Sequence, residues 1–166
     1  MTVERLRPGY EELFRTEYAR VVGTVLSIVG DRADAESVTQ DAFLKALVRW
    51  GRISRYDRPG AWVRRVAIRD AVRLAERRPA PLDELGAVAD PIDRVAARLD
   101  LARALATLPA RQRAAIVLQH LAGWPTAEIA GALGCSESTV RVHLHRGRAA
   151  LGALLSDDPQ ELHDGR

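Results

Sequence analysis

Cysteine and lysine are almost absent from this chain of 166 residues, which has one residue of each type. The single cysteine, Cys135, excludes an internal disulfide framework and gives no zinc cluster. No apolar run approaches the ~18–20 residues that cross a membrane, and the polar N-terminus lacks the apolar segment of a signal peptide. We therefore expect a cytoplasmic protein without membrane insertion.

Aromatic residues are also few, at 5% of the chain, although hydrophobic residues make up 47%. The apolar residues are mainly Ala, Leu and Val, which favours helical bundles. The net charge is +3, and all but one of the 25 positive residues are arginines. Arginine keeps its charge and binds phosphate through a bidentate fork. The composition therefore suits an anionic partner, although a GC-rich genome would raise the same residues.

Hydrophobic spacing predicts three helices in the first half of the chain. The first covers residues 10–29 and ends at Gly30-Asp31, with Phe14 among its inward residues. The second covers residues 34–50, and a polar loop at residues 51–58 follows it. Pro59 suits the first position of the third helix, which is predicted at residues 59–77.

Residues 79–92 contain three prolines and are acidic, so they are the best candidate for a linker. Further helices are predicted at residues 93–106 and 110–121, and no segment has the composition of strands. We expect an all-α fold of two small helical domains joined by this Pro-containing acidic linker. The predicted boundaries are 1–78 for the first domain, 79–92 for the linker, 93–155 for the second domain and 156–166 for a polar, disordered tail.

The second domain ends in a helix-turn-helix pattern. Two short helical segments, beginning at Thr126 and Ser136, flank Gly134-Cys135. Ser136 is a good N-cap, and no acid occurs from Ser138 to Leu155. A helix of this charge suits the major groove of DNA and its phosphate walls. The alternative is a basic surface helix in an ordinary bundle.

The third helix carries a stripe of four arginines, each four residues from the next, at Arg65, Arg69, Arg73 and Arg77. Like charges at this spacing repel, which indicates a polyanion that neutralises them. Trp62 begins the stripe and either anchors the core or stacks on an unpaired base. A solvated basic face remains the alternative.

The second helix has a mixed face, because Asp41, Leu44 and Val48 share one side away from its core-facing residues. An acidic and apolar face indicates protein docking rather than nucleic-acid binding. A solvated flank with scattered aliphatic residues is the alternative.

An enzymatic function is not supported by the sequence. His143 and His145 are two residues apart on a helix and point away from each other, so they cannot chelate one ion. The chain contains no glycine-rich phosphate loop and no nucleophile–base motif. We expect no catalytic residue, metal or cofactor, and no small-molecule substrate.

Three segments resemble extracytoplasmic-function (group IV) bacterial sigma factors. Residues 33–50, ADAESVTQDAFLKALVRW, resemble the segment that in this family reads like AEDLVQEAFLRAW. Residues 61–78 resemble the family's next helix, and residues 108–151 resemble its C-terminal DNA-reading domain. The helix-turn-helix alone is shared with many regulators, whereas three motifs in order are specific.

The resemblance implies a sigma factor that binds core RNA polymerase and directs promoter-specific transcription initiation. It implies that the first domain binds the β′ clamp helices and reads and melts the −10 element, while the second binds the β flap and reads the −35 element. An anti-sigma factor is a further expected partner. By position, the polymerase-binding residues are Gln40, Asp41, Leu44 and Lys45; the −10-facing residues are Trp62, Arg65, Arg69, Arg73 and Arg77; and the −35-reading residues are Ser136, Ser138, Thr139, Arg141, His145, Arg146 and Arg148.

The chain departs from the family pattern at four of these helix positions. The family often has Asn where this chain has Arg69 and Asp where it has Arg73. In the recognition helix, Val142 and His143 replace a small residue and an arginine. These departures concern the promoter sequence rather than the role. The alternative function is a stand-alone helix-turn-helix regulator whose first domain senses a ligand or dimerises.

Overall fold

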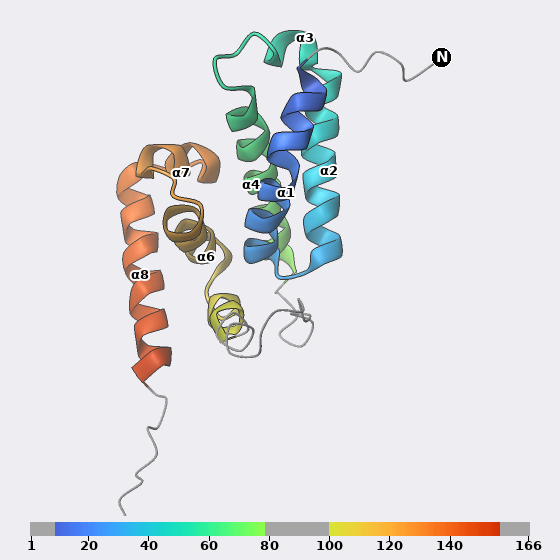
Figure 1. Cartoon of the computed structure of the whole chain (residues 1–166). Helices are drawn as coiled ribbons and strands as arrows, with labels where there is room; N and C mark the ends of the chain where they lie inside the picture. Colours follow the sequence, from blue (N-terminus) through green and yellow to red (C-terminus); the bar gives the residue numbers. More distant parts are fainter. Residues whose placement is uncertain (1–8, 79–99, 157–166) are drawn as a thin grey trace, which may run out of the picture.

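The computed structural model describes residues 9–78 and 100–156, and within them the chain is helical with no strand. Two groups of helices lie side by side, one from each half of the chain (Figure 1). The prediction of an all-α fold with two helical domains is confirmed. The first group contains α1 (Tyr10–Val29), α2 (Arg32–Val48), α3 (Trp50–Ile53) and α4 (Pro59–Arg77); the second contains α6 (Ala110–Ile116), the π-helical turn η1 (Val117–Leu121), α7 (Thr126–Leu133) and α8 (Glu137–Ser156).

The N-terminal domain is a bundle in which α1, α2 and α4 each pack against the other two. Gly30 adopts a left-handed conformation (φ 78°) that ends α1, and its N–H donates to the Leu26 carbonyl. The next residue, Asp31, caps α2 by accepting a hydrogen bond from the N–H of Asp34 at 2.8 Å. This Gly-Asp pair therefore ends one helix and begins the next within two residues, which sets α1 and α2 antiparallel.

Two details of this domain differ from the prediction. Phe14 was predicted to point inward but is 40% exposed: its ring packs edge-to-face with the buried Phe43, with ring centroids 5.0 Å apart, and stacks on the half-buried Tyr18. The segment after α2 was predicted as a polar loop from residue 51, yet Trp50–Ile53 forms the short helix α3. Burial of both Trp50 and Ile53 explains this turn, since only a helical turn brings residues three apart onto one face.

The C-terminal domain begins, within the described residues, with helical residues 100–106. The predicted helix at 110–121 is present, but its last turn widens into the π-helical η1, where the Ala122 N–H donates to the Val117 carbonyl. The cap predicted at Ser136 is confirmed by its Oγ, which accepts from the Thr139 N–H at 3.1 Å. The predicted linker 79–92, residues 93–99 of the helix predicted at 93–106, and residues 157–166 of the predicted tail lie outside the described residues. The tail was predicted from residue 156, but Ser156 is the last residue of α8.

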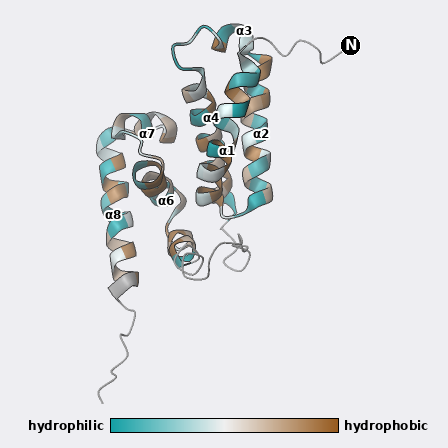
Figure 2. Cartoon of the chain, viewed as in Figure 1, coloured by the Kyte–Doolittle hydropathy of each residue, from teal (hydrophilic) through white to brown (hydrophobic). Residues whose placement is uncertain are grey.

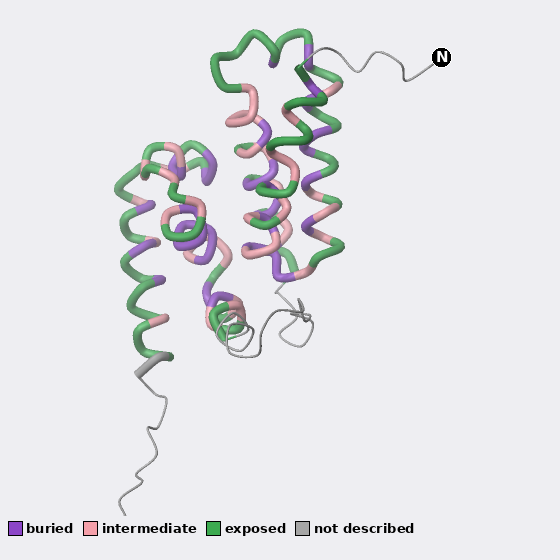
Figure 3. Tube along the Cα trace, in the orientation of Figure 1, coloured by how far each residue is buried: buried purple, intermediate pink, exposed green. Residues whose placement is uncertain are grey.

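The two domains share one hydrophobic core that continues across the boundary between them. Helix α4 contacts both α6 and α7, and α1 contacts η1 and α6. Apolar segments face the interior of each helix group in Figure 2, and the buried parts of the trace follow them in Figure 3. In the described part of the chain, no helix is both long and apolar enough to cross a membrane.

Candidate nucleic-acid and polymerase interfaces

Helices α7 and α8 form the helix-turn-helix. Gly134 supplies the left-handed turn between them (φ 65°), and Ile129, Val140 and Leu144 are buried where the helices meet. This packing directs the opposite side of α8 outward. The −35-reading residues predicted from the sequence share this outer side: Ser136, Ser138, Arg141, His145, Arg146 and Arg148 are exposed and Thr139 is half-buried.

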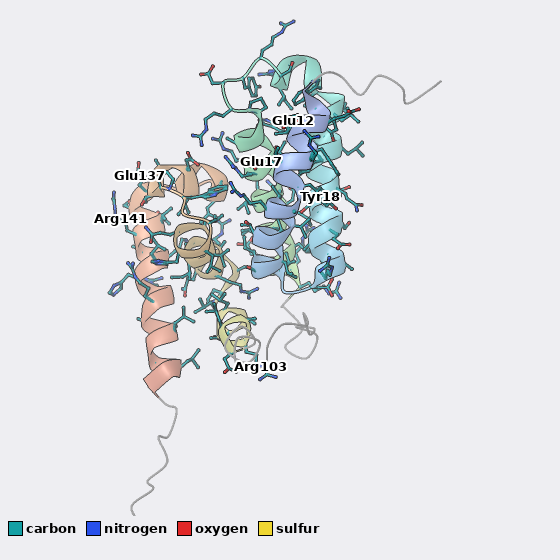
Figure 4. The ribbon with its side chains drawn as sticks, in the orientation of Figure 1. Glu12, Glu17, Tyr18, Arg103, Glu137 and Arg141 are labelled. Carbon is teal, nitrogen blue, oxygen red and sulfur yellow. The ribbon has the colours of Figure 1, made fainter. Side chains whose placement is uncertain are left out.

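The outer side of α8 is less uniformly basic than its sequence indicated. Glu137 begins the helix, and its carboxylate lies 3.4 Å from the guanidinium of Arg141. Figure 4 labels both residues at the N-terminal end of α8. The sequence analysis considered acids only from Ser138 onward, so it missed Glu137 as a partner that partly compensates the charge of Arg141. The pair is exposed, and such pairs contribute only ~0–1 kcal/mol, so Arg141 can exchange Glu137 for another anion.

The inner side of α8 carries His143, one of the two departures from the family pattern on this helix. Burial lowers the pKa of His143, and the positive charges of Arg111 and Arg146 lower it further. Its Nδ1 is buried without a hydrogen-bond partner among the described residues. The neighbouring departure, Val142, is 45% exposed. Of the two departures, only Val142 thus presents a largely exposed side chain.

The arginine stripe predicted on the third helix lies on α4, and all four of its arginines are exposed. Asp70 compensates only part of the charge of the stripe, because its carboxylate is shared. It pairs with Lys45 of α2 at 2.6 Å and with Arg73 at 3.8 Å. Glu76, the other acid of this helix, pairs with Arg111 of α6 instead. The stripe therefore keeps an excess of positive charge.

The N-terminal half of the stripe faces the other domain. The Arg69 guanidinium donates to the carbonyl of Gly131, near the end of α7, at 3.4 Å. A Cβ at Gly131 would lie 3.8 Å from the Nε of Arg65. Arg73 and Arg77 make their described contacts within α4 only, with Asp70 and with each other. The structure thus divides the stripe into two arginines beside α7 and two turned to solvent.

An aromatic cavity adjoins the start of α4. It has a volume of about 280 Å³, and Tyr56, Trp62, Arg65 and Trp124 are among its lining residues. Trp62 is half-buried and packs against the core, so it both anchors the bundle and reaches this cavity. Tyr56 is 38% exposed on the loop before α4. The sequence analysis missed Tyr56, although an aromatic residue in an otherwise polar loop was a signal for it.

The predicted polymerase-binding residues lie on α2, and Gln40, Asp41, Leu44 and Lys45 are all exposed. Leu44 is 57% and Val48 74% exposed, which is unusual for aliphatic side chains in a helix whose other side is buried. Gln40 donates to the hydroxyl of Tyr18 on α1, and Lys45 is held by Asp70 of α4. The exposed apolar side chains of this surface, Leu44 and Val48, are therefore flanked by polar side chains that are fixed by contacts with α1 and α4.

Models of two protein families match the two domains separately. The sigma-70 region 2 model matches residues 13–79, and the sigma-70 region 4 model matches residues 98–151. The region 2 match covers most of the first domain, so this domain is a sigma-factor domain. It therefore sets aside the alternative of a regulator whose first domain senses a ligand or dimerises.

Two solved structures share the fold. The sigma factor RpoE of Bartonella quintana, in complex with the anti-sigma factor NepR, has a TM-score of 0.68 at 21% identity, covering 90% of this chain and 98% of that one. CnrH, in complex with the cytosolic domain of CnrY, has a TM-score of 0.66 at 28% identity and covers 90% of this chain and 88% of its own.

Curated relatives identify the family. The ECF RNA polymerase sigma factor SigM of Mycobacterium tuberculosis is 34% identical over 154 residues, which are 90% of this chain and 78% of SigM. The RNA polymerase sigma-E factor of Streptomyces antibioticus is 33% identical over 147 residues, covering 86% and 82% of the two chains. The chain thus belongs to the ECF family of RNA polymerase sigma factors, which are not enzymes and which direct transcription initiation with RNA polymerase.

Proposed function

We propose that this sigma factor uses three separate surfaces, one for each of its targets. The surface on α2 binds the β′ clamp helices of core polymerase, the arginine stripe of α4 binds the −10 element, and the outer side of α8 reads the −35 element. The observation that carries this division is that all three surfaces have exposed side chains and that the α2 surface, mixed acidic and apolar, differs in chemistry from the basic surfaces of α4 and α8.

In this proposal the −10 strand is held rather than only recognised. Separating strands costs ~1–2 kcal/mol per base-pair step in lost stacking, so the unpaired strand needs its own binding site. A basic groove with aromatic platforms is the usual form of such a site. Arg65, Arg69, Arg73 and Arg77 supply the charge, and the cavity lined by Tyr56 and Trp62 supplies the platform.

The domain boundaries and the remaining partners belong to the same proposal. Residues 1–78 form the domain for polymerase and the −10 element, 79–92 the linker, and 93–155 the domain for the −35 element and the β flap. The two related structures contain an anti-sigma factor and the cytosolic domain of CnrY. We extend this to an anti-sigma factor for this chain, which would act in the cytoplasm of a bacterium.

A test of the α2 surface is the double variant Asp41→Arg with Leu44→Ala. Both side chains are exposed, so the bundle should fold normally by circular dichroism, whereas affinity for core polymerase should fall at least tenfold, as expected when an apolar anchor and a charge are lost together. Glu11→Arg with Leu154→Ala makes the same chemical changes on two other exposed sites and should bind like the wild type. Equal affinity of both variants would contradict the assignment of α2.

A further inference from the structure

Arginine side chains make nearly all the polar contacts that join the two domains. From the N-terminal domain, Arg58 pairs with Glu128 at 3.1 Å, Arg64 lies over the ring of Trp124, and Arg69 donates to Gly131. Two arginines of the C-terminal domain contact the N-terminal domain. Arg111 pairs with Glu76 at 2.7 Å, and Arg113 donates to the Ile28 carbonyl at 2.6 Å.

Arg113 differs from the others because it is buried, with 4% of its surface exposed. Its guanidinium donates to the carbonyls of Leu105 and Leu108, both at 2.9 Å, and of Ala106 at 3.2 Å. Its remaining bond is to Ile28, in the last turn of α1, where helix carbonyls lack partners and carry partial negative charge. Burial lowers the pKa of Arg113, but carbonyl oxygens surround its charge.

A second helix end is held in the same way. The last turn of α7 has unpaired carbonyls, and Arg69 of α4 donates to the one at Gly131 while Arg111 of α6 donates to the one at Leu133, at 3.1 Å. The end of a helix macrodipole carries about half a negative charge. Arg69 thus donates to a carbonyl of partial negative charge supplied by the other domain, and Arg65 lies beside the same residue, since a Cβ at Gly131 would be 3.8 Å from its Nε. Both arginines belong to the stripe where the proposed function places DNA phosphate.

We propose that the chain closes on itself: the C-terminal end of α7 occupies the anion-binding position of Arg65 and Arg69, and Arg113 latches this closed form. The proposal rests on the function assigned above to α4. Domain closure then excludes a single strand from Arg65 and Arg69, for which the strand and α7 compete, and thereby weakens −10 strand binding. Arg73 and Arg77, which make no contact with the C-terminal domain among the described residues, remain available in both forms.

The latch is separable from the weaker contacts. The ion pair of Arg58 with Glu128 is exposed, as its side chains retain 65% and 32% of their surface, and exposed pairs contribute little. Removing a buried guanidinium instead leaves the carbonyls that it served without partners, which costs more than losing an exposed ion pair. Arg113→Lys keeps the charge but cannot serve the carbonyls on both sides with one ammonium group. This variant should therefore shift the chain toward the open form.

Closure itself is measured by spin labels on the full chain. In a Cys135→Ala background, Ala19→Cys on α1 and Ala149→Cys on α8 place labels at exposed positions of the two domains. Pulsed dipolar spectroscopy should give one narrow distance distribution for the otherwise unchanged protein and a longer, broader one for Arg113→Lys. A broad distribution already in the unchanged protein would overturn the proposal.

Masking is measured by fluorescence anisotropy with a labelled oligothymidylate of about 12 nucleotides. Apparent affinity is reduced by the fraction of chain that is competent to bind, so a chain that is open about a tenth of the time should gain about tenfold on opening by Arg113→Lys. Arg113→Lys also changes contacts inside the C-terminal domain. Binding of duplex DNA by the C-terminal domain therefore serves as the check that this domain is folded. If the spin labels show an open Arg113→Lys chain but its affinity for oligothymidylate is unchanged, the proposal that α7 masks the stripe is overturned.

Gly131 offers a second test that leaves the latch intact. A side chain there meets Arg65 at an ordinary van der Waals distance of 3.8 Å, so Gly131→Glu adds a carboxylate beside the stripe and Gly131→Gln is its neutral control of the same shape. Gly131→Glu should bind oligothymidylate more weakly than Gly131→Gln and lose this difference at high salt. Equal affinities at low salt would overturn the proposed competition.

Failure of the underlying function would look different. Arg73→Ala in the Arg113→Lys background should weaken oligothymidylate binding, because Arg73 belongs to the stripe but not to the closed contact. If Arg73→Ala had no effect in the open chain, α4 would not be the strand-binding surface, and masking would be refuted with it. The spin-label distances would still report closure independently of that result.

Discussion

The two basic helices, α4 and α8, have nearly the same length, with 19 and 20 residues, and very different surroundings. Within the described residues, helix α8 packs mainly against α6 and α7 and turns its arginines to solvent. Helix α4 packs against α1 and α2 on one side and against α6 and α7 on the other. Two helices with similar charge can therefore differ in the availability of their arginines. The arginines of α8 are open to solvent, whereas Arg69 of α4 already contacts the other domain.

The difference follows from the position of each helix in the chain's packing. A helix at the centre of two domains meets carbonyl and carboxylate groups from both, and arginine is the side chain that binds them at a distance from its backbone. In the proposed function, the arginines of α4 therefore face a competition between DNA and the other domain. Among the described residues, the arginines of α8 have one acidic partner, Glu137, which lies on the same helix and pairs with Arg141.

The largest effect is expected from the solvent-facing part of the stripe. Arg73→Ala with Arg77→Ala should leave polymerase binding unchanged but reduce open-complex formation ~100-fold or more, since each hydrogen bond from a charged group contributes ~1.5–3 kcal/mol. Permanganate reactivity of thymines near the start site measures the open complex. A pre-melted template should restore part of the activity.

The control for this double variant is Arg15→Ala with Arg32→Ala, which removes the same charge from exposed sites on α1 and α2. If both double variants reduced promoter opening equally, net charge rather than the position of α4 would explain the effect. The contrast between α4 and the rest of the surface would then be lost.

A smaller effect is expected where α8 rests on its own domain. A Cβ at Gly147 would lie 2.9 Å from Cγ1 of Ile116, so α8 approaches α6 more closely than any other residue allows. Gly147→Ala should destabilise the protein by ~1–3 kcal/mol through overpacking. In α1, a Cβ at Gly23 meets nothing within 4 Å, so Gly23→Ala should stabilise it by up to ~1 kcal/mol. Urea unfolding measures both, and the same sign for both would refute the tight contact.

Local signals in the sequence were sufficient to predict most of the helices. Gly30-Asp31, Pro59 and Ser136 each act within their own turn, where capping and φ restriction depend on neighbours in sequence. The helix-turn-helix and the exposed sides of α2 and α8 follow from the same short-range periodicity. The prediction of an inward side chain was wrong at Phe14, because helical spacing shows which residues share a face but not how far along the helix that face is covered by its neighbours.

Contacts between distant residues could not be predicted. Arg113 reads in the sequence as one more arginine among 24, and Arg69 only as a member of the stripe. Their partners at the ends of α1 and α7 follow only from the packing of the two domains. Tyr56 reads as part of a polar loop until α4 and Trp124 form a cavity beside it. Long-range partners are set by the tertiary arrangement, on which residue type and spacing carry little information.

On the outer side of α8, we expect an effect on the specificity of DNA binding that is similar in free energy to the effect of Gly147→Ala on stability. Arg141 lies in the first turns of the recognition helix and Arg148 further along, so we expect a base contact from Arg141 and a phosphate contact from Arg148. Arg141→Ala should lose ~1–3 kcal/mol of discrimination between base pairs. Arg148→Ala should weaken binding evenly and make the salt dependence shallower. Equal losses on specific and random duplexes for both variants would refute base reading by Arg141.

The smallest expected effect is a pH dependence that belongs to α8 and not to α4, which contains no histidine. Burial and two arginines lower the pKa of His143 below its ordinary 6.5, so the folded chain holds this imidazole neutral while the unfolded chain protonates it. The contribution of the neutral imidazole to stability is therefore fully present above pH 6.5 and decreases as the pH falls below 6.5. Between about pH 7.5 and 5.5, thermal unfolding midpoints should fall more steeply for the wild type than for His143→Gln. The other histidines are common to both proteins and cancel, so parallel pH profiles would show that burial on the inner side of α8 does not lower the pKa of His143.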